Sequence, residues 1–406
     1  MSSDSVVAPS VPQYTPAGWA HFPGNPDFNF QFARALGGVQ EDAGTVSEIM
    51  LVGSRIPNGD KEAWHREWTR MAEVNKARAQ AAAKVGHFQT AKSTFMRAAN
   101  YYRSAEFFLG HTDPRRMQTF EQVEACTQQY LARLEPAGEV VRIPYFDGTY
   151  LPAYFIRAPY DEARQPTILA FGGLDEYKDE LVHEMVKFAL PRGFSLLLVD
   201  LPGQGGSLRR QGLNGRYDAE VPVGRVIDYL LTRNDVDPER IALYGASLGG
   251  HYATRAASFE KRIKVVVNDG GMWDLHRFAV GLRQKPNSNH IPHFEWVLNV
   301  KGLEEFIERA KDFRLRGVAT QIAVPLLITF GEADFLGIQE VQDAEQELRA
   351  AGVNFSLKIF SSEETGAGHC QCDNPTLGQE YICDWIADQL GIDQAAMQKR
   401  MAQLHL

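Results

Sequence analysis

The sequence is poor in cysteine, has no excess of basic residues and contains no long apolar run. Four cysteines in 406 residues are too few for a disulfide scaffold. The 51 acidic residues outnumber the 42 basic ones, which disfavours a nucleic acid or an anionic membrane as the main partner. No apolar run reaches the length of a membrane span, and residues 1–12 lack the charged start and apolar core of a secretory signal. We therefore expect a cytoplasmic protein that binds a small molecule.

Two of the four cysteines lie beside a histidine, in the segment His-Cys-Gln-Cys at 369–372. This spacing differs from the two-residue knuckle of zinc sites, and no second Cys/His pair lies nearby. Cys126 and Cys383 fall on helical faces and are expected to be buried thiols. The sequence therefore predicts neither a metal site nor a metal cofactor.

The periodicity of apolar residues changes along the chain. Residues 1–25 are rich in Ser, Pro and Gly and are expected to form an arm, whereas 26–136 repeat apolar residues every three or four positions, as helices do. From 137 to 406, apolar runs alternate with helical stretches, which predicts an α/β fold with a mostly parallel, doubly wound sheet. The interval at about 272–321 lacks a clean strand. We interpret it as a lid over the carboxyl ends of the strands, where ligands bind in such sheets.

The predicted strands begin with a hairpin whose turn is Asp147-Gly148. The expected strands cover 140–144, 150–157, 167–171, 195–200, 241–244, 264–267, 325–330 and 354–360, with helices at 179–190, 221–233 and 250–258.

The segment 245–249 reads Gly-Ala-Ser-Leu-Gly between a buried strand and a helical stretch. Gly-x-Ser-x-Gly in this setting is typical of a nucleophile elbow, in which Ser247 lies on a sharp, strained turn. Side chains at Gly245 and Gly249 would collide with neighbouring backbone in such a turn. The pattern therefore predicts Ser247 as a nucleophile.

A serine hydroxyl needs a base to remove its proton and an acid to orient that base. Asp334 follows the strand 325–330, with Glu332 and Asp269 as alternative acids. His369 follows the last strand on a loop of small residues. The order serine, acid, histidine predicts a triad of Ser247, Asp334 and His369.

An oxyanion hole needs two N–H donors directed at the developing charge. The N–H of Leu248, directly after the nucleophile, is one candidate, and the N–H of Gly173 or Leu174 is the other. The Gly-Gly-Leu-Asp loop at 172–175 lacks the third glycine of a dinucleotide fingerprint, so no organic cofactor is predicted.

These motifs together resemble those of one branch of the α/β-hydrolases. They are Gly-Leu-Asp-x-x-Lys-x-Glu at 173–180, Asp-Leu-Pro-Gly-Gln-Gly at 200–205, Gly-x-Ser-x-Gly-Gly at 245–250, Gly-x-Gly-His-Cys-Gln at 366–371 and the helical segment 98–108. The branch contains 2,6-dihydroxypseudooxynicotine hydrolase, fungal polyketide-shortening hydrolases and FrsA-like esterases. The resemblance covers roughly residues 60–390.

The resemblance implies an α/β-hydrolase fold, the same triad, an N-terminal helical domain that helps to cover the active site, and a homodimer. The branch includes both carbon–carbon bond hydrolases and carboxylesterases, and the former can use an additional acidic residue. We expect lid aromatics and one of two lid acids, together with a tyrosine of the oxyanion loop, to contact the substrate. These residues are Tyr177, Trp273, Asp274, Phe278, Glu295 and Trp296.

Three functional hypotheses follow. The favoured one is a serine hydrolase that cleaves a carbon–carbon bond in a β-diketone or polyketide-like substrate by acyl transfer to water. The second is a carboxylesterase acting on an apolar or aromatic ester. The third, from another class, is a non-catalytic binding protein that retains the fold. The natural substrate and its pathway are not encoded in any motif.

Overall fold

The computed structural model describes residues 20–403, so residues 1–19 of the predicted arm lie outside the described residues. Helices come first along the chain: α1 (Pro26–Gly37), α2 (Val46–Gly53), α3 (Lys61–Lys84), α4 (Phe88–Glu106) and α5 (Pro114–Leu131). Side chains fix their starts, because Asn25, Asp60 and Asp113 accept hydrogen bonds from N–H groups of the first turns of α1, α3 and α5. Buried aromatic side chains such as Trp64 and Trp68 form the core between these helices.

The second part of the chain forms an eight-stranded sheet within the described residues. Its strands are β1 (Glu139–Pro144), β2 (Tyr150–Ile156), β3 (Gln165–Phe171), β4 (Ser195–Val199), β5 (Val236–Ala246), β6 (Val265–Asp269), β7 (Leu326–Gly331) and β8 (Phe355–Phe360). Their order is β1-β2-β4-β3-β5-β6-β7-β8, with β1 and β2 antiparallel to their neighbours and all other pairs parallel. This topology confirms the predicted mostly parallel α/β sheet.

Two details of the sheet differ from or refine the prediction. The turn at Asp147-Gly148 has positive φ values of 52° and 74°, which suits the expected hairpin turn. Strand β5 begins at Val236, five residues before its predicted start at Ile241, because Val236 pairs with Gln165 ahead of a bulge. The polar residues between Val236 and Ile241 hide this extension from a reading based on hydropathy.

Alternate residues of the central strands face opposite sides of the sheet. Leu169 and Leu197 pack in the core with α8 and α9, whereas Ile168 and Leu196 pack with α6 and α14. The helices of this part are α6 (Lys178–Ala189), α7 (Gly205–Gln211), α8 (Glu220–Thr232), α9 (Leu248–Phe259), α13 (Ile338–Ala351), α14 (Pro375–Gln389) and α15 (Gln394–Gln403). Both faces of the sheet are therefore covered, as a doubly wound fold requires.

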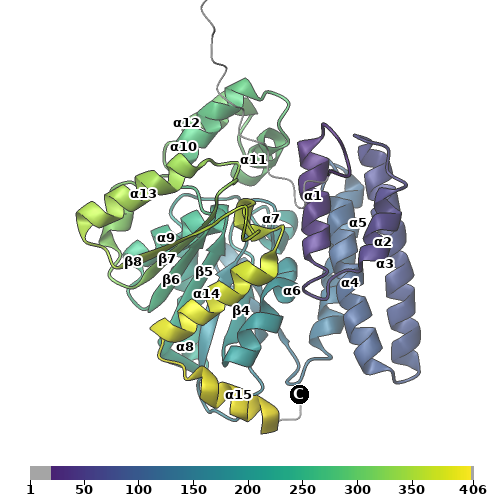
Figure 1. The fold of residues 1–406 in the computed structure, drawn as a ribbon, viewed down its shortest axis with the longest axis horizontal. Coiled ribbons are helices and arrows are strands. Elements are labelled where there is room, and N and C mark those ends of the chain that lie inside the picture. The colour runs from purple at the N-terminus through teal and green to yellow at the C-terminus, as the bar shows by residue number, and fades with distance from the viewer. Residues whose placement is uncertain (1–19, 404–406) are drawn as a thin grey trace, which may run out of the picture.

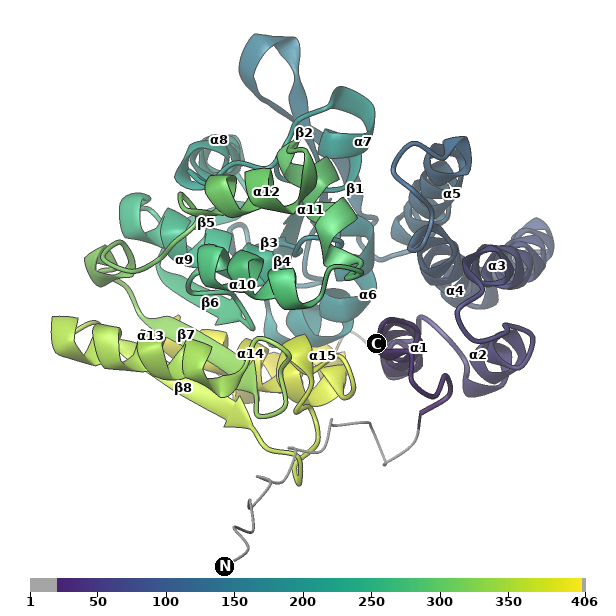
Figure 2. The same cartoon turned by 90° about the horizontal axis from the view of Figure 1, so that it is seen from above.

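The interval between β6 and β7 forms α10 (Leu275–Gly281), α11 (His290–Leu298) and α12 (Gly302–Ala310). Figures 1 and 2 show these helices above the end of the sheet, with α1 beside α11 and the other N-terminal helices on the same flank. The side chain of Asn289 hydrogen-bonds to Asp27 and Lys61, which ties this interval to the N-terminal helices. None of the described helices is long and apolar enough to cross a membrane.

Candidate active site

Ser247 lies at the junction of β5 and α9, in the backbone conformation of a nucleophile elbow. Its φ of 56° and ψ of −123° are strained values for a residue with a side chain. A Cβ atom at Gly245 would lie 2.1 Å from the Gly249 carbonyl oxygen, and one at Gly249 would lie 2.3 Å from the Gly172 carbonyl oxygen. Only glycine fits at both positions, so the Gly-x-Ser-x-Gly pattern is a steric requirement of this turn.

His369 lies between Ser247 and Asp334. The Nε2 atom of His369 is 2.8 Å from the Ser247 hydroxyl oxygen, and its Nδ1 atom is 2.8 Å from Oδ2 of Asp334. Because a carboxylate only accepts hydrogen bonds, Nδ1 carries the proton of the neutral ring and Nε2 is left as the acceptor. The second oxygen of Asp334 accepts the N–H of Leu336 at 2.9 Å, which fixes the carboxylate. This arrangement can remove the proton of the serine hydroxyl.

The two alternative acids contact other groups. Asp269 is buried and accepts hydrogen bonds from the hydroxyls of Tyr244 at 2.9 Å and Thr329 at 2.8 Å. Glu332 is exposed and accepts a backbone N–H at 2.7 Å on an outer loop. Neither carboxylate hydrogen-bonds to His369 in the described structure. The acid that contacts the imidazole is therefore the one in the loop after β7.

Two opposing effects set the basicity of His369. Burial by itself lowers the pKa of the imidazole, but the Asp334 carboxylate outweighs it, with smaller contributions from Asp269 and Asp175, and the pKa is raised above its ordinary value. In contrast, burial lowers the pKa of His251 to about 4, and its Nδ1 atom donates to the Met272 carbonyl oxygen at 2.9 Å. Of these two histidines, His369 is the one suited to take up a proton.

The loop after β3 lies directly against the serine. A Cβ atom at Gly173 would be 3.3 Å from the Ser247 hydroxyl oxygen. The N–H of Gly173 donates to Oε2 of Glu176 at 3.3 Å, whereas the N–H of Leu174 has no acceptor among the described residues. Leu248 is the first residue of α9, so its N–H has no acceptor within the helix. The N–H groups of Leu174 and Leu248 thus lie beside the serine without an acceptor among the described residues.

A cavity of about 980 Å³ contains the serine and the histidine. Its walls come from α1 and α4, from the loop after β3 and the start of α6, from α10 and α11, and from the loops after β6, β7 and β8. Several aromatic side chains form the apolar side of the cavity. One of them, Phe335, contacts the His369 ring with a centroid separation of 4.4 Å. Members of this group that line the cavity are Phe30, Phe107, Phe278, His290, His293 and Phe335.

Only one of the six residues predicted to contact substrate lines this cavity. Phe278, on α10, lies in its wall. Tyr177 instead lies outside it, packed against Phe120 with its hydroxyl donating to Glu106 at 3.1 Å. Trp273 is buried, and its indole N–H donates to a glutamate of α13 at 2.9 Å. Both aromatic side chains serve packing, which corrects their predicted contact with substrate.

The predicted lid acids and the second lid tryptophan also lie outside the cavity wall. Asp274 caps α10, because its carboxylate accepts the N–H of Arg277 at 3.2 Å. Glu295 is half-buried on α11, and Trp296 packs beneath the guanidinium groups of Arg116 and Arg209. Asp274 and Glu295 therefore do not line the cavity, as an assisting acid would have to. Trp296 does not line it either, which corrects its predicted contact with substrate.

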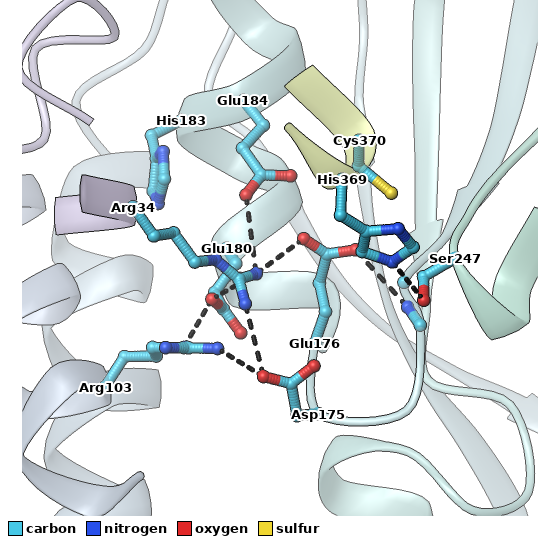
Figure 3. Close-up of polar contacts among 12 residues, drawn as sticks. Arg34, Arg103, Asp175, Glu176, Glu180, His183, Glu184, Ser247, His369 and Cys370 are labelled. Carbon is cyan, nitrogen blue, oxygen red and sulfur yellow. Dashed lines mark hydrogen bonds and ion pairs between the residues drawn. The ribbon is translucent and has the colours of Figure 1, made fainter. Parts of the chain in front are cut away.

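A cluster of charged residues in the cavity was not predicted (Figure 3). Arg34 on α1 contacts Glu176 at 2.8 Å and Glu180 at 2.9 Å, and Arg103 on α4 contacts Glu180 at 2.5 Å and Asp175 at 3.1 Å. The sequence signal is the four-residue spacing of glutamates at 176, 180 and 184, which is typical of one face of a helix; in the structure Glu180 and Glu184 lie on α6, and Glu176 precedes it. The arginines come from about 70 and 140 residues away, so no local pattern links them to these acids.

The carboxylate oxygens of Glu176, Glu180 and Glu184 lie within 4.8 Å of one another, which is close enough to hold a metal ion. The Nη2 atom of Arg34, however, lies 2.8, 2.9 and 3.8 Å from these three groups. The guanidinium therefore takes the place of a cation among them, and the donor set does not fit a metal ion as it stands.

Known proteins are similar to this chain in sequence. Residues 51–287 match the family described as Esterase FrsA-like, and residues 187–393 match the prolyl oligopeptidase family. Hydrolase LUC6 from a Fusarium species is 30% identical over 407 residues, covering 90% of this chain and 97% of that protein. The 20-hydroxy-prefusarin hydrolase FUS2 of Gibberella moniliformis is 37% identical over 257 residues, which are 61% of each chain. Hydrolase acrC of Aspergillus aculeatus is 34% identical over 373 residues, covering 80% and 86%.

Solved structures share the architecture at lower identity. The structure of 2,6-dihydroxy-pseudo-oxynicotine hydrolase superposes with a TM-score of 0.73 at 24% identity, over 87% of this chain and 95% of that one. The structure of AbyA5 superposes with a TM-score of 0.70 at 17% identity, over 93% and 99%. The fold is therefore that of the α/β-hydrolases. Because its family match covers more than half of the sequence, the chain belongs to the FrsA-like esterase family, and the protein is a hydrolase.

Proposed function

We propose that the protein is a serine hydrolase that transfers an acyl group from a carbonyl substrate to water. Ser247 attacks the carbonyl carbon, His369 takes the hydroxyl proton, and Asp334 orients the imidazole and stabilises its charged form. The observation that carries the proposal is the pair of 2.8 Å contacts that His369 makes with Ser247 and Asp334 at a strained elbow. The hypothesis of a non-catalytic binding protein is not retained, because the matching family is described as esterase-like and relatives such as LUC6 are named hydrolases.

The tetrahedral oxyanion would bind the N–H groups of Leu248 and Leu174. Of the two upstream donors considered, Gly173 is the weaker candidate, since its N–H is already bound to the Glu176 carboxylate at 3.3 Å. That bond instead holds the turn that presents Leu174. Gly173 contributes by its lack of a side chain, because a Cβ atom there would lie 2.8 Å from the Cβ of Ser247.

For the substrate, we favour a β-diketone or polyketide-like compound cleaved at a carbon–carbon bond. The support is similarity to FUS2, whose name describes a prefusarin derivative as its substrate, and an aromatic cavity wall. Attack by Ser247 forms a bond to the carbonyl carbon. The carbon–carbon bond then breaks, its electron pair becomes an enolate stabilised by the second carbonyl, and His369 returns the proton to that carbon. Water then attacks the acyl carbon while His369 takes a proton from the water. The bond between that carbon and the Ser247 oxygen breaks, His369 gives the proton to this oxygen, and a carboxylic acid leaves.

The family description favours a second candidate, a carboxylesterase acting on an apolar or aromatic ester. The same residues would act, but the leaving group would be an alkoxide protonated by His369. Product analysis with a β-diketone and an ester of matched acyl and leaving groups separates the two candidates. Turnover of the ester alone would exclude the carbon–carbon reaction.

A fluorophosphonate probe tests the shared chemistry directly. We expect the wild-type protein to be labelled and to hydrolyse 4-nitrophenyl butyrate, and the Ser247→Ala variant to do neither. Ser207 is buried and donates to the Asp200 carbonyl oxygen, so Ser207→Ala serves as a control that should remain labelled. A wild-type protein that resists the probe would refute the serine mechanism.

We further propose a division into an arm at 1–25, a helical cap at 26–136 and a hydrolase domain at 137–406 with a lid at about 272–321.

We also propose a homodimer. Helices α2 and α3 lie on the outer flank in Figure 2, and apolar side chains that are exposed on these two helices support such a contact. They are Val46, Met50, Leu51 and Val74. Light scattering should give the mass of a dimer for the wild-type protein and a lower mass for the Met50→Glu variant.

We place the protein in the cytoplasm. The support is that its four cysteines, all within the described residues, are free thiols, which suits a reducing compartment. Fractionation of producing cells with an antibody would test this placement.

A further inference from the structure

Helix α11 of the lid begins with a histidine, His290, that lines the cavity and takes no part in the triad. Its ring is half-buried and packs against two aromatic rings of the cavity wall, those of Phe278 and Phe335, each at a centroid separation of 5.5 Å. The proposed hydrolysis, carried out by the triad and the oxyanion hole, leaves this imidazole without a role.

The position of His290 is held by its neighbours in the chain as well as by these rings. The hydroxyl oxygen of Ser288 lies 3.0 Å from Nδ1 of the imidazole. The preceding residue, Asn289, hydrogen-bonds to Asp27 and to Lys61, which belong to the N-terminal helices α1 and α3. A side chain fixed in this way can meet a substrate without first being ordered, which favours binding and catalysis.

The contact with Ser288 also determines which ring nitrogen of His290 carries the proton. The Ser288 hydroxyl oxygen accepts the backbone N–H of His290 at 3.3 Å, and Nδ1 is the acceptor available to the hydroxyl proton among the described residues. The neutral ring then carries its own proton on Nε2. This atom has no hydrogen-bond partner among the described residues and, unlike the buried Nε2 of His251, retains accessible surface. The cavity wall therefore presents a free N–H donor.

The surroundings keep this donor uncharged. Burial lowers the pKa of His290, and the nearby carboxylates of Asp175 and Asp27 oppose the effect only in part. A neutral imidazole with one N–H can polarise a carbonyl group without competing with the catalytic base for protons. The chemistry available to His290 is therefore hydrogen-bond donation to an oxygen atom of the substrate.

The ring of Phe335 links His290 to the side of the triad where a leaving group must lie. Its centroid is 5.5 Å from that of His290 and 4.4 Å from that of His369. His369 has to reach the leaving atom, because it returns the proton to that atom. The leaving part of a substrate therefore lies beside His369, and His290 borders the same region of the cavity.

We propose that His290 is a further catalytic residue, whose Nε2–H group binds the second carbonyl oxygen of a β-diketone-like substrate. Its catalytic part rests on the proposed function, whereas binding of the oxygen requires no turnover. When the carbon–carbon bond breaks, its electron pair forms the enolate, and much of the charge lies on this oxygen. The N–H group stabilises that charge and keeps its own proton, while the carbon receives its proton from His369.

Calorimetry on the Ser247→Ala variant tests the binding of the second oxygen without turnover. Benzoylacetone and butyrophenone differ in one carbonyl group, so the ratio of their Kd values on one protein isolates the effect of that group. We expect Ser247→Ala to bind benzoylacetone at least about fivefold more tightly, as one added hydrogen bond implies. In the double variant Ser247→Ala/His290→Phe, which keeps an aromatic ring against Phe278 and Phe335, the ratio should fall to about twofold or less.

His276 provides the matched control, because it is a half-buried histidine of the same lid that lies outside the cavity wall. The double variant Ser247→Ala/His276→Phe should retain the ratio. With the serine intact, His290→Phe should hydrolyse 4-nitrophenyl butyrate within about threefold of the wild-type kcat, because this leaving group forms no enolate.

Equal Kd values for the two ketones on Ser247→Ala would overturn the proposal, as would an unchanged ratio in Ser247→Ala/His290→Phe. A loss of ester hydrolysis in His290→Phe as large as that in Ser247→Ala would also overturn it, because the ring would then support the triad rather than a substrate oxygen. Failure of the hydrolase proposal would appear separately, as absence of fluorophosphonate labelling in a wild-type protein that still prefers benzoylacetone.

Discussion

Replacing Asp334 by asparagine changes one oxygen that faces His369. In the wild-type protein Oδ2 accepts the Nδ1 proton of the imidazole at 2.8 Å. An asparagine can present its NH₂ group there, in which case Nδ1 becomes the acceptor and the ring proton moves to Nε2. A protonated Nε2 would donate to the serine hydroxyl and could no longer remove its proton. The substitution therefore disables the base while keeping the shape of the site.

The size of the loss follows from this change of tautomer. Serine hydrolases with the equivalent change lose about 10⁴ in kcat, and each factor of ten corresponds to about 1.36 kcal/mol, so the barrier should rise by about 5.4 kcal/mol. Loss of the Asp334 charge acts in the same direction, because that carboxylate contributes most to the raised pKa of His369.

Matched variants of the two other acids serve as controls. Asp269→Asn leaves the contact between His369 and Asp334 untouched, since Asp269 is bound by hydroxyl groups. Glu332→Gln alters an exposed contact on an outer loop. We expect Glu332→Gln to keep wild-type kcat and Asp269→Asn to stay within about tenfold of it, because Asp269 contributes less than Asp334 to the raised pKa of His369.

Hydrolysis of 4-nitrophenyl butyrate, followed by the absorbance of the released 4-nitrophenolate, measures kcat for the wild-type protein and the three variants. Circular dichroism and the thermal midpoint establish that each variant is folded. Asp334 does not orient the base if Asp334→Asn retains more than about a tenth of wild-type kcat, or if Asp269→Asn loses as much kcat as Asp334→Asn.

Three further results are expected. Gly173→Ala should lower kcat/KM by at least about a hundredfold with little loss of fold, because its Cβ would lie 2.8 Å from the Cβ of Ser247; near-normal kinetics would contradict this. The wild-type kcat/KM should rise with pH through a pKa above 6.5, since His369 must be neutral to act and its pKa is raised; a rise centred at or below 6.5 would contradict it. Arg103→Met should lower the free energy of unfolding in urea by roughly 3 kcal/mol at pH 8 and by less at pH 6, where Glu180 takes up a proton; equal losses would refute this account.

The contacts of His369 with Ser247 and Asp334 could be predicted because each of the three residues is marked locally. The elbow around Ser247 needs glycines that the sequence displays, and Asp334 and His369 follow strands that end at the same edge of a parallel sheet. The order of the three residues along the chain therefore predicts that their side chains meet. Gly173 and Leu174 are equal candidates as donors in the sequence, because no local pattern indicates that the carboxylate of Glu176 binds the N–H of Gly173.

The cavity walls could not be predicted in the same way. Trp273 and Trp296 lie in the expected interval, but aromatic side chains there pack against a glutamate or arginines just as readily as they line a cavity. Arg34 and Arg103 reach the loop after β3 only through the packing of α1 and α4 on α6. Such contacts depend on tertiary structure, and no periodicity or spacing within one segment encodes them.

The placement of α1 and α4 in the cavity wall has an evolutionary consequence. The groups of the proposed triad come from loops at the ends of strands, whereas Arg34, Glu41 and Arg103 come from residues before 110. Mutations in the early part of the chain can therefore change which molecules are accepted without altering the reactive groups. A lineage built this way can acquire new substrates by drift in its N-terminal helices while its chemistry stays constant.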